Sequence, residues 1–222
     1  MMKRLAGLTQ TMLLTGEAGA VETLVTEPEQ VHGIALVCHP HPLFGGTYTN
    51  KVVHTVAKTL ALQGYAVMCP NFRGVGGSEG IHDYGEGETR DMLEILRWAR
   101  QRWGCLPLCL SGFSFGAYVQ IRVANHLVQQ QTPASRLILL GTATGAAADG
   151  SRFYVTEPLP PADIRLLIHG SDDDVVPLQN VFDWAAPQSL PITVIPGTGH
   201  FFHGKLMVIR DVICSVCPPL VK

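Results

Sequence analysis

The sequence predicts an α/β fold in which a mostly parallel central sheet is flanked by helices on both faces. From residue 33 onward, short apolar runs alternate with segments of helical length, and strands that are hydrophobic throughout are typical of parallel sheets buried on both sides. The composition agrees, because 46% of the 222 residues are hydrophobic and only 15% are charged. A chain of this length can bury a substantial core, and we expect one domain over residues 1–222.

The charge balance argues against several classes of partner. The net charge is −2, and no basic run is longer than Lys3-Arg4. Binding to nucleic acid or to an anionic membrane is therefore not expected, because phosphate groups require clustered positive charge. No apolar stretch approaches the roughly 20 residues that cross a bilayer. The oligomeric state is not predicted.

The N-terminus fits two readings. Residues 1–20 have a basic start and a small-residue end, as in a signal peptide, but Thr9, Gln10 and Thr11 interrupt the apolar region. The same residues predict an antiparallel hairpin with strands Thr11–Thr15 and Val21–Thr26 around a Gly16–Gly19 turn. We favour the hairpin.

Six cysteines indicate a reducing compartment. Most stand in or beside apolar runs, where a thiol behaves as a small hydrophobic group. Cys214 and Cys217 have the spacing of a redox or metal pair, but two prolines follow and no second ligand pair is near. We therefore expect reduced cysteines and a cytoplasmic location.

The remaining elements follow in order along the chain. Strands are predicted at Gly33–Cys38, Tyr65–Pro70, Leu106–Leu110, Leu137–Leu140, Arg165–His169 and Ile192–Ile195. Helices are predicted at Asn50–Gln63, Glu86–Trp103, Ser114–Gln129, Leu178–Ala185 and Phe201–Val216. Ligands of such sheets bind beyond the carboxyl ends of the strands, so the polar residues there are the candidates for function.

One of these strand ends carries Gly112-Phe113-Ser114-Phe115-Gly116, a G-x-S-x-G motif. A serine on a sharp strand-to-helix turn is held in a strained conformation, and the flanking glycines leave room for neighbouring chain. The next helix directs its N–H groups toward developing negative charge. A glycine-rich turn with an incidental capping serine is the alternative for the motif alone.

A serine nucleophile needs a base and an acid that orients the base. Two later strands end in suitable segments: 169-HGSDDDVVP-177 offers three carboxylates, and 196-PGTGHFFHG-204 offers two imidazoles. The candidates thus follow the order Ser, Asp, His.

With these motifs and 39-HPHPLFGG-46 and 71-NFRGVGGSEG-80, nearly the whole chain resembles the α/β-hydrolases, and among them the small bacterial serine hydrolases without a lid. The resemblance implies Asp173 as the acid and His200 as the base. Spacing alone leaves Asp172 and Asp174 open. His203 is expected in the first turn of the terminal helix.

The resemblance also implies an oxyanion hole of two backbone N–H groups. One is that of Phe115, directly after the nucleophile, and the other comes from the 39–46 loop. Pro40 and Pro42 have no N–H, so His41 is the first candidate and Leu43 the second.

Two other motifs have alternative readings. His39 and His41 have the H-x-H form of a metal site. A metal would need a third ligand, such as His82 or Asp83, and nothing in the sequence brings one near. We therefore expect no metal and no other cofactor. The segment 73-RGVGGSEG-80 is similar to a phosphate cradle but lacks the Lys-Ser/Thr of a P-loop. We expect Arg73 and Ser78 to hold a tight turn at the edge of the site.

The segment Thr142–Asp163 is too short to form a cap domain. We therefore expect an open site with substrate-binding walls from Leu43, Phe44, Phe113 and Phe115. The predicted function is hydrolysis of small carboxylic esters, with a small acyl substrate as the partner and thioesters or activated amides as further substrates. A non-catalytic binding protein with the same fold, and a peptidase or acyltransferase with the same triad, are the alternatives.

Overall fold

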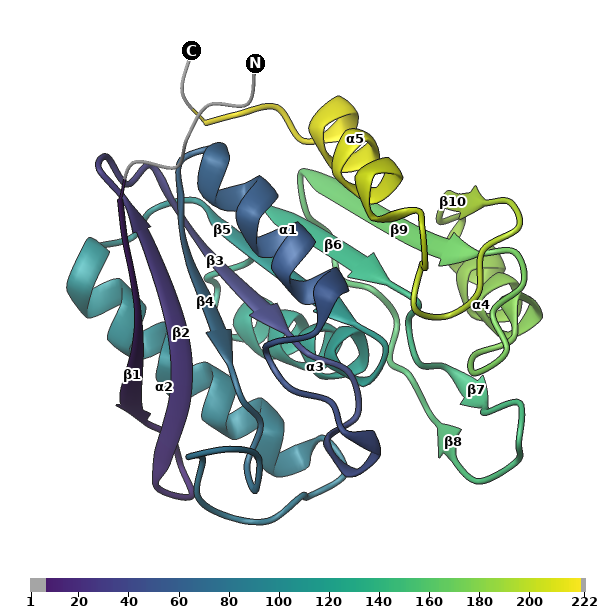
Figure 1. Cartoon of the computed structure of the whole chain (residues 1–222), viewed down its shortest axis with the longest axis horizontal. Coiled ribbons are helices and arrows are strands. Elements are labelled where there is room, and N and C mark those ends of the chain that lie inside the picture. The colour runs from purple at the N-terminus through teal and green to yellow at the C-terminus, as the bar shows by residue number, and fades with distance from the viewer. Residues whose placement is uncertain (1–6, 221–222) are drawn as a thin grey trace.

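The computed structural model describes residues 7–220, and a single eight-stranded sheet runs through it (Figure 1). Its strands lie in the order β1-β2-β4-β3-β5-β6-β9-β10. Their bounds are β1 Gly7–Thr15, β2 Ala20–Pro28, β3 Gly33–Cys38, β4 Tyr65–Pro70, β5 Leu108–Phe113, β6 Arg136–Leu140, β9 Ile164–Gly170 and β10 Ile192–Ile195. Strands β7 Gly145–Ala146 and β8 Phe153–Tyr154 form a separate small antiparallel pair.

The sheet is parallel from β4 to β10, and antiparallel where β1 pairs with β2 and β2 with β4. The predicted hairpin is thus confirmed and is joined to the main sheet through β2. The basic start at Lys3 and Arg4 lies outside the described residues. Because β3, β5, β6, β9 and β10 all run in one direction, the loops at their carboxyl ends meet at one edge.

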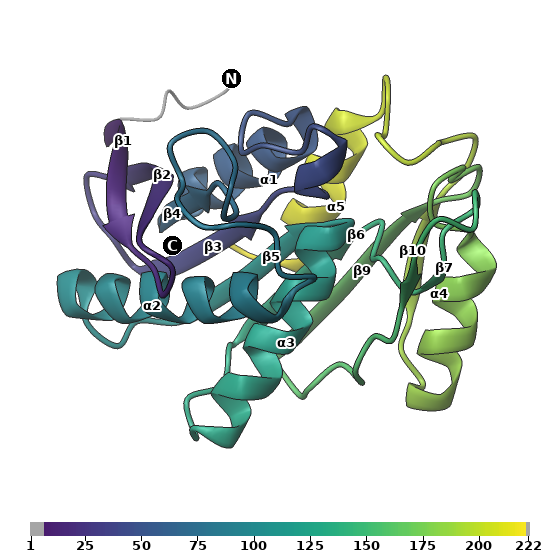
Figure 2. The same cartoon turned by 90° about the horizontal axis from the view of Figure 1, so that it is seen from below.

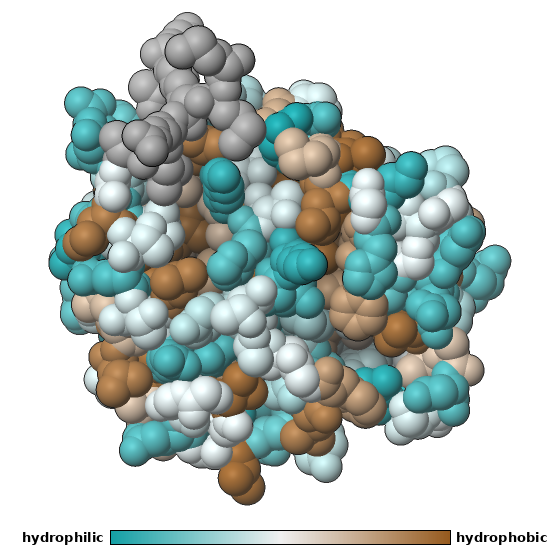
Figure 3. Space-filling model, viewed as in Figure 1, coloured by the Kyte–Doolittle hydropathy of each residue, from teal (hydrophilic) through white to brown (hydrophobic). Residues whose placement is uncertain are grey.

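Helices cover both faces of the sheet, as predicted (Figure 2). They are α1 Lys51–Leu62, α2 Glu86–Trp103, α3 Phe115–Gln129, α4 Leu178–Ala185 and α5 Leu206–Val216. Helices α1 and α5 pack on one face, and α2, α3 and α4 contribute to the core on the other. Side chains of β3 alternate between these cores: Leu36 joins the core under α2, α3 and α4, and Val37 joins the core under α1 and α5. The outer surface over α1 and α5 carries hydrophobic residues only in small groups among hydrophilic ones (Figure 3).

Several predicted boundaries were wrong. The first strand of the hairpin begins at Gly7 and not at Thr11. The terminal helix begins at Leu206 and not at Phe201, because Phe202 and Gly204 have positive φ angles of 52° and 71° that a right-handed helix does not allow. His203 therefore precedes the helix. The strand predicted at Leu106–Leu110 instead runs from Leu108 to Phe113 and ends one residue before Ser114.

The segment between β6 and β9 forms no cap domain. Within residues 7–220, its only regular structure is the β7–β8 pair, which lies on the side of the sheet toward which β6 and β9 point (Figure 1). In the same residues, no helix combines the length and the hydrophobicity that a membrane crossing requires.

Candidate active site

Ser114 occupies a strained turn between β5 and α3. Its φ of 57° and ψ of −119° lie outside the regions that non-glycine residues ordinarily adopt. The turn packs tightly against β3: a Cβ on Gly116 would stand 2.5 Å from the His39 carbonyl oxygen. A Cβ on Gly112 would stand 2.5 Å from the Ala117 nitrogen. Both glycines are therefore required by close backbone contacts, which hold the serine at the sheet edge.

Asp173 and His200 form a buried pair after β9 and β10. The Nδ1 atom of His200 lies 2.8 Å from Oδ2 of Asp173. The other carboxylate oxygen accepts backbone N–H groups of Val175 and Val176 at 3.0 and 2.8 Å. Burial alone would raise the pKa of Asp173, but the hydrogen bond and charge of His200, with the Val176 N–H, hold it below its ordinary value of 3.8. The carboxylate is thus ionised and fixed in place.

The sequence reasoning missed a second histidine at Asp173. His169, on β9, places Nε2 2.9 Å from the Val176 carbonyl oxygen and 3.3 Å from the same Asp173 oxygen that faces His200. Burial lowers the pKa of His169, so its imidazole is neutral and Nε2 carries the proton that it donates. The position of His169 in the segment 169-HGSDDDVVP-177 was the available signal.

Ser114 and His200 line one cavity of about 270 Å³. Among the described residues, no hydrogen bond joins the Ser114 hydroxyl to the imidazole. Such bonds are often long in unliganded enzymes and shorten around the substrate. The ring of Phe113 stacks behind His200 with centroids 4.9 Å apart. We expected Phe113 in the cavity wall, and this was wrong, because its side chain enters the core under α1 and α5 and is 1% exposed.

The backbone N–H groups of His41 and Phe115, the two proposed oxyanion donors, have no hydrogen-bond partner among residues 7–220. The N–H of Leu43, the second candidate of the sequence, instead donates to Nδ1 of His41 at 3.3 Å. The loop that carries His41 is held by His39, whose Nε2 accepts the Phe72 N–H at 2.9 Å while Nδ1 lies 2.6 Å from the Pro40 oxygen. Both ring nitrogens of His39 are thereby engaged, which disfavours the H-x-H metal reading.

The two loop histidines are uncharged. Burial, followed by the charges of His82 and Arg152, lowers the pKa of His41 from 6.5 to about 4. Burial likewise lowers the pKa of His39 from 6.5 to about 4. Neither imidazole therefore places a positive charge beside the cavity at neutral pH.

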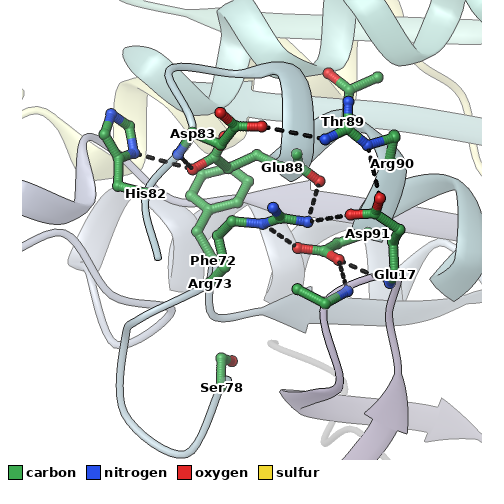
Figure 4. A network of polar contacts seen from close by, with 12 residues as sticks. Glu17, Phe72, Arg73, Ser78, His82, Asp83, Glu88, Thr89, Arg90 and Asp91 are labelled. Carbon is green, nitrogen blue, oxygen red and sulfur yellow. Dashed lines mark hydrogen bonds and ion pairs between the residues drawn. The ribbon is translucent and has the colours of Figure 1, made fainter. Parts of the chain in front are cut away.

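A buried polar network holds the loop between β4 and α2 (Figure 4). The Nε atom of Arg73 donates to Asp91 at 2.8 Å, and Nη2 donates to Glu17 at 3.0 Å and to the Gly87 oxygen at 2.8 Å. The hydroxyl of Ser78 donates to the Asn71 oxygen at 2.9 Å. These contacts fit the expected structural role of Arg73 and Ser78.

The same loop carries His82 to the site, which nothing in the sequence indicated. Its Nδ1 lies 2.9 Å from the fully buried carboxylate of Glu88, which also accepts the N–H groups of Asp83 and Gly85 (Figure 4). The His82 ring stands 4.8 Å from the ring of His41. Across residues 7–220, no group of three or more potential ligands is arranged to hold a metal ion.

A second, larger cavity of about 540 Å³ adjoins the first. The two share His41, Phe44 and Arg152. The larger cavity is lined mostly by rings: it is bounded by His41, Leu43, Phe44, His82, Tyr84, Phe115, Tyr118, Ser151, Arg152, Phe153, Tyr154 and Val155. The walls that we expected from Leu43, Phe44 and Phe115 thus belong to it. The β7–β8 segment supplies a further wall that the sequence did not indicate.

Comparison with known proteins gives consistent matches. The family described as serine aminopeptidase, S33, matches residues 29–159. An uncharacterised protein of Rickettsia prowazekii is 32% identical, over 78% of this chain and 73% of that protein. Lysophosphatidylserine lipase ABHD12 of Danio rerio is 30% identical over 67% of this chain and 48% of the lipase, so this chain spans about half the length of that relative.

Solved structures extend the likeness to the whole fold. An α/β serine hydrolase without a lid from Xanthomonas campestris superposes with a TM-score of 0.79 and 33% identity, over 97% of this chain and 95% of that chain. An α/β serine hydrolase homologue from Coxiella burnetii gives a TM-score of 0.79 and 34% identity, over 93% and 96% of the two chains.

Proposed function

This chain belongs to the α/β-hydrolase superfamily, and from that premise we propose that it is a serine esterase acting through Ser114, Asp173 and His200. Its family is described as a serine aminopeptidase family, and the lipase of Danio rerio and the serine hydrolase of Xanthomonas campestris are hydrolases. The observation that carries the proposal is the shared cavity: a strained serine faces the same space as an imidazole bonded to a buried carboxylate. These are the parts that acyl transfer to serine requires.

The reaction proceeds in two steps. His200 takes the proton of Ser114 as the hydroxyl attacks the ester carbonyl carbon, and it then gives that proton to the departing alcohol. Asp173 keeps the Nδ1 proton of His200 in place and stabilises the imidazolium. Water then attacks the acyl-enzyme with His200 again as the base, which releases the acid and restores the serine.

The N–H groups of His41 and Phe115 hold the oxyanion of each tetrahedral intermediate. Both are unpaired among the described residues, so they can bind the negative charge without first losing another partner. The bonds of His39 fix the loop before the substrate arrives. Removing one such donor typically costs about 10²–10³ in kcat.

The similarity to a lipase supports ester substrates over amides. Lysophosphatidylserine lipase ABHD12 of Danio rerio, 30% identical to this chain, is an ester-cleaving enzyme by its name. The family description also includes peptidases. A panel of alkyl esters, acyl thioesters and aminoacyl amides therefore decides the reaction class, and faster hydrolysis of the amides would replace the esterase proposal by an aminopeptidase one.

The nucleophile is tested by Ser114→Ala. A fluorophosphonate probe should label the wild-type protein at Ser114 and leave the variant unlabelled. Ester hydrolysis should fall by about 10⁴-fold or more, because the nucleophile and its base act as a unit. Circular dichroism and the melting temperature check that the variant is folded. A variant that keeps activity within tenfold of wild type would show that another group is the nucleophile.

A further inference from the structure

The larger cavity is lined by a group of ring side chains that we call the aromatic cavity. Its rings are those of His41, Phe44, His82, Tyr84, Phe115, Tyr118, Phe153 and Tyr154. Neighbouring rings within it are tilted or edge-on with centroid separations of 4.8 to 6.3 Å, as between His41 and Phe115 and between Phe115 and Tyr154. These are the separations at which aromatic quadrupoles attract one another.

The walls of the aromatic cavity are partly open to solvent. Tyr84 is 77% exposed and Phe153 is 71% exposed. Exposed rings gathered around a concave surface next to a reactive serine indicate a binding site, because burial of such rings is favourable. The aromatic cavity lies directly beside the Ser114 cavity, because the two share three lining residues.

The position of His200 decides which part of an ester enters each cavity. His200 must reach the leaving oxygen to protonate it, and it lines only the smaller cavity. The alcohol therefore departs through the smaller cavity. His41 lines both cavities, whereas Phe115, which carries the other proposed oxyanion donor, lines only the aromatic cavity. The aromatic cavity is therefore the space that remains for the acyl group.

We propose that the aromatic cavity binds the acyl group of the substrate and selects acyl chains that carry an aryl ring, such as arylalkanoic esters. This inference rests on the proposed esterase function. A bound aryl ring would add one more tilted or offset pair to the existing group, and Tyr118 and Tyr154, whose centroids lie 5.3 Å apart, would form its inner wall.

Matched methyl esters test the inference. Methyl 3-phenylpropanoate and methyl 3-cyclohexylpropanoate have the same chain length and similar size, but only the first has an aromatic quadrupole. We expect kcat/KM to favour the phenyl ester by about 2- to 10-fold. The variants Tyr84→Leu and Tyr154→Leu should reduce this ratio toward one. Tyr84 is exposed, so Tyr84→Leu should fold normally. This variant therefore still tests the inference if Tyr154→Leu fails to fold.

Two controls separate the possible outcomes. Phe182→Leu makes a similar change on α4, outside both cavities, and should leave the ratio unchanged. The acetates of 2-phenylethanol and 2-cyclohexylethanol place the ring on the alcohol, where we expect no preference. Equal rates for the two methyl esters, or a preference only for the ring on the alcohol side, would overturn this inference. In that case labelling of Ser114 would still support the esterase function. Absence of both labelling and hydrolysis would overturn the inference and the esterase function together.

Discussion

Three consecutive carboxylates follow β9, and their surroundings differ sharply. Asp173 is buried, whereas Asp172 and Asp174 are exposed. Only Asp173 has oxygens that meet His200, His169 and two backbone N–H groups. A carboxylate held by several donors keeps its charge and its orientation inside the protein, which is what the orienting member of a triad requires.

Asparagine substitutions at two of these positions test this assignment. Asp173→Asn should lower kcat/KM for a methyl ester by about 10⁴-fold, because the amide favours the wrong imidazole tautomer. Asp172→Asn is the matched control and should change kcat/KM by less than about threefold, since its side chain is exposed and, among the described residues, accepts a hydrogen bond only from Ser171. A comparable loss at Asp172, or a small one at Asp173, would contradict the assignment.

At the scale of elements, the turn between β5 and α3 depends on contact with β3. Gly116 lies in the first turn of α3 and packs directly on the carbonyl groups of Cys38 and His39. The same contact fixes the beginning of the loop that carries the His41 N–H. The proposed nucleophile and one proposed oxyanion donor are therefore positioned by one backbone-to-backbone contact.

Gly116→Ala should disrupt that contact. Its Cβ would meet backbone atoms that have little room to move, so we expect the free energy of unfolding to fall by about 1–3 kcal/mol and kcat to fall at least tenfold in the folded fraction. Urea denaturation and active-site titration measure the two effects.

Gly104→Ala, at the end of α2, is the control for this experiment. Gly104 has a φ of 79° and open space around its would-be Cβ. Its ψ of −171° places it in a region that is essentially restricted to glycine, so its substitution should cost about 1–3 kcal/mol of backbone strain and leave kcat unchanged. Unchanged kcat in folded Gly116→Ala would contradict the proposed role of the contact.

At the scale of the whole molecule, the parallel sheet gathers residues from five separate loops at one edge. Joining those loops requires buried polar side chains, of which His39 is the clearest example because it ties the loop after β3 to the loop after β4. Its buried imidazole is held neutral. The architecture of the site therefore has a consequence for stability in acid.

Acid should destabilise the protein partly through His39. The pKa of His39 is lowered from 6.5 to about 4 in the folded state, so between these values the unfolded chain binds a proton that the folded chain does not. The stability contribution is fully present above about pH 6.5 and is lost as the pH falls toward about 4. Between pH 6.5 and 4.5 the loss from this one group is about 2 kcal/mol.

Denaturation of His39→Gln measures this contribution. Glutamine keeps an acceptor for the Phe72 N–H but has no titrating group, so the free energy of unfolding should vary less with pH than in the wild type over this interval. His203→Gln is the control, because His203 is exposed. Its free energy of unfolding should vary with pH as that of the wild type does. Equal slopes for His39→Gln and the wild type would count against a neutral, buried His39.

Much of the fold follows from local sequence. The continuous apolar run Gly33–Cys38 is a buried central strand as predicted, and Leu178–Ala185 is a helix with the predicted bounds. The sheet class and the antiparallel hairpin were predicted because periodicity and turn residues are properties of neighbouring positions. Helix α5 was misplaced at its start, because the sequence Phe201-Phe202-His203 looks helical in composition while its backbone is not.

By itself, the sequence determined the α/β class, the strained turn at Ser114, and the order Ser, Asp, His along strand ends, since each depends on residues close together in the chain. Only the tertiary structure decided that Asp173 is the buried carboxylate, that Phe113 supports His200 from the core, and that His82 reaches the His41 loop. These facts depend on how segments far apart in the sequence pack against one another. Packing decides which of several similar neighbouring residues is buried, and the local sequence pattern does not distinguish them.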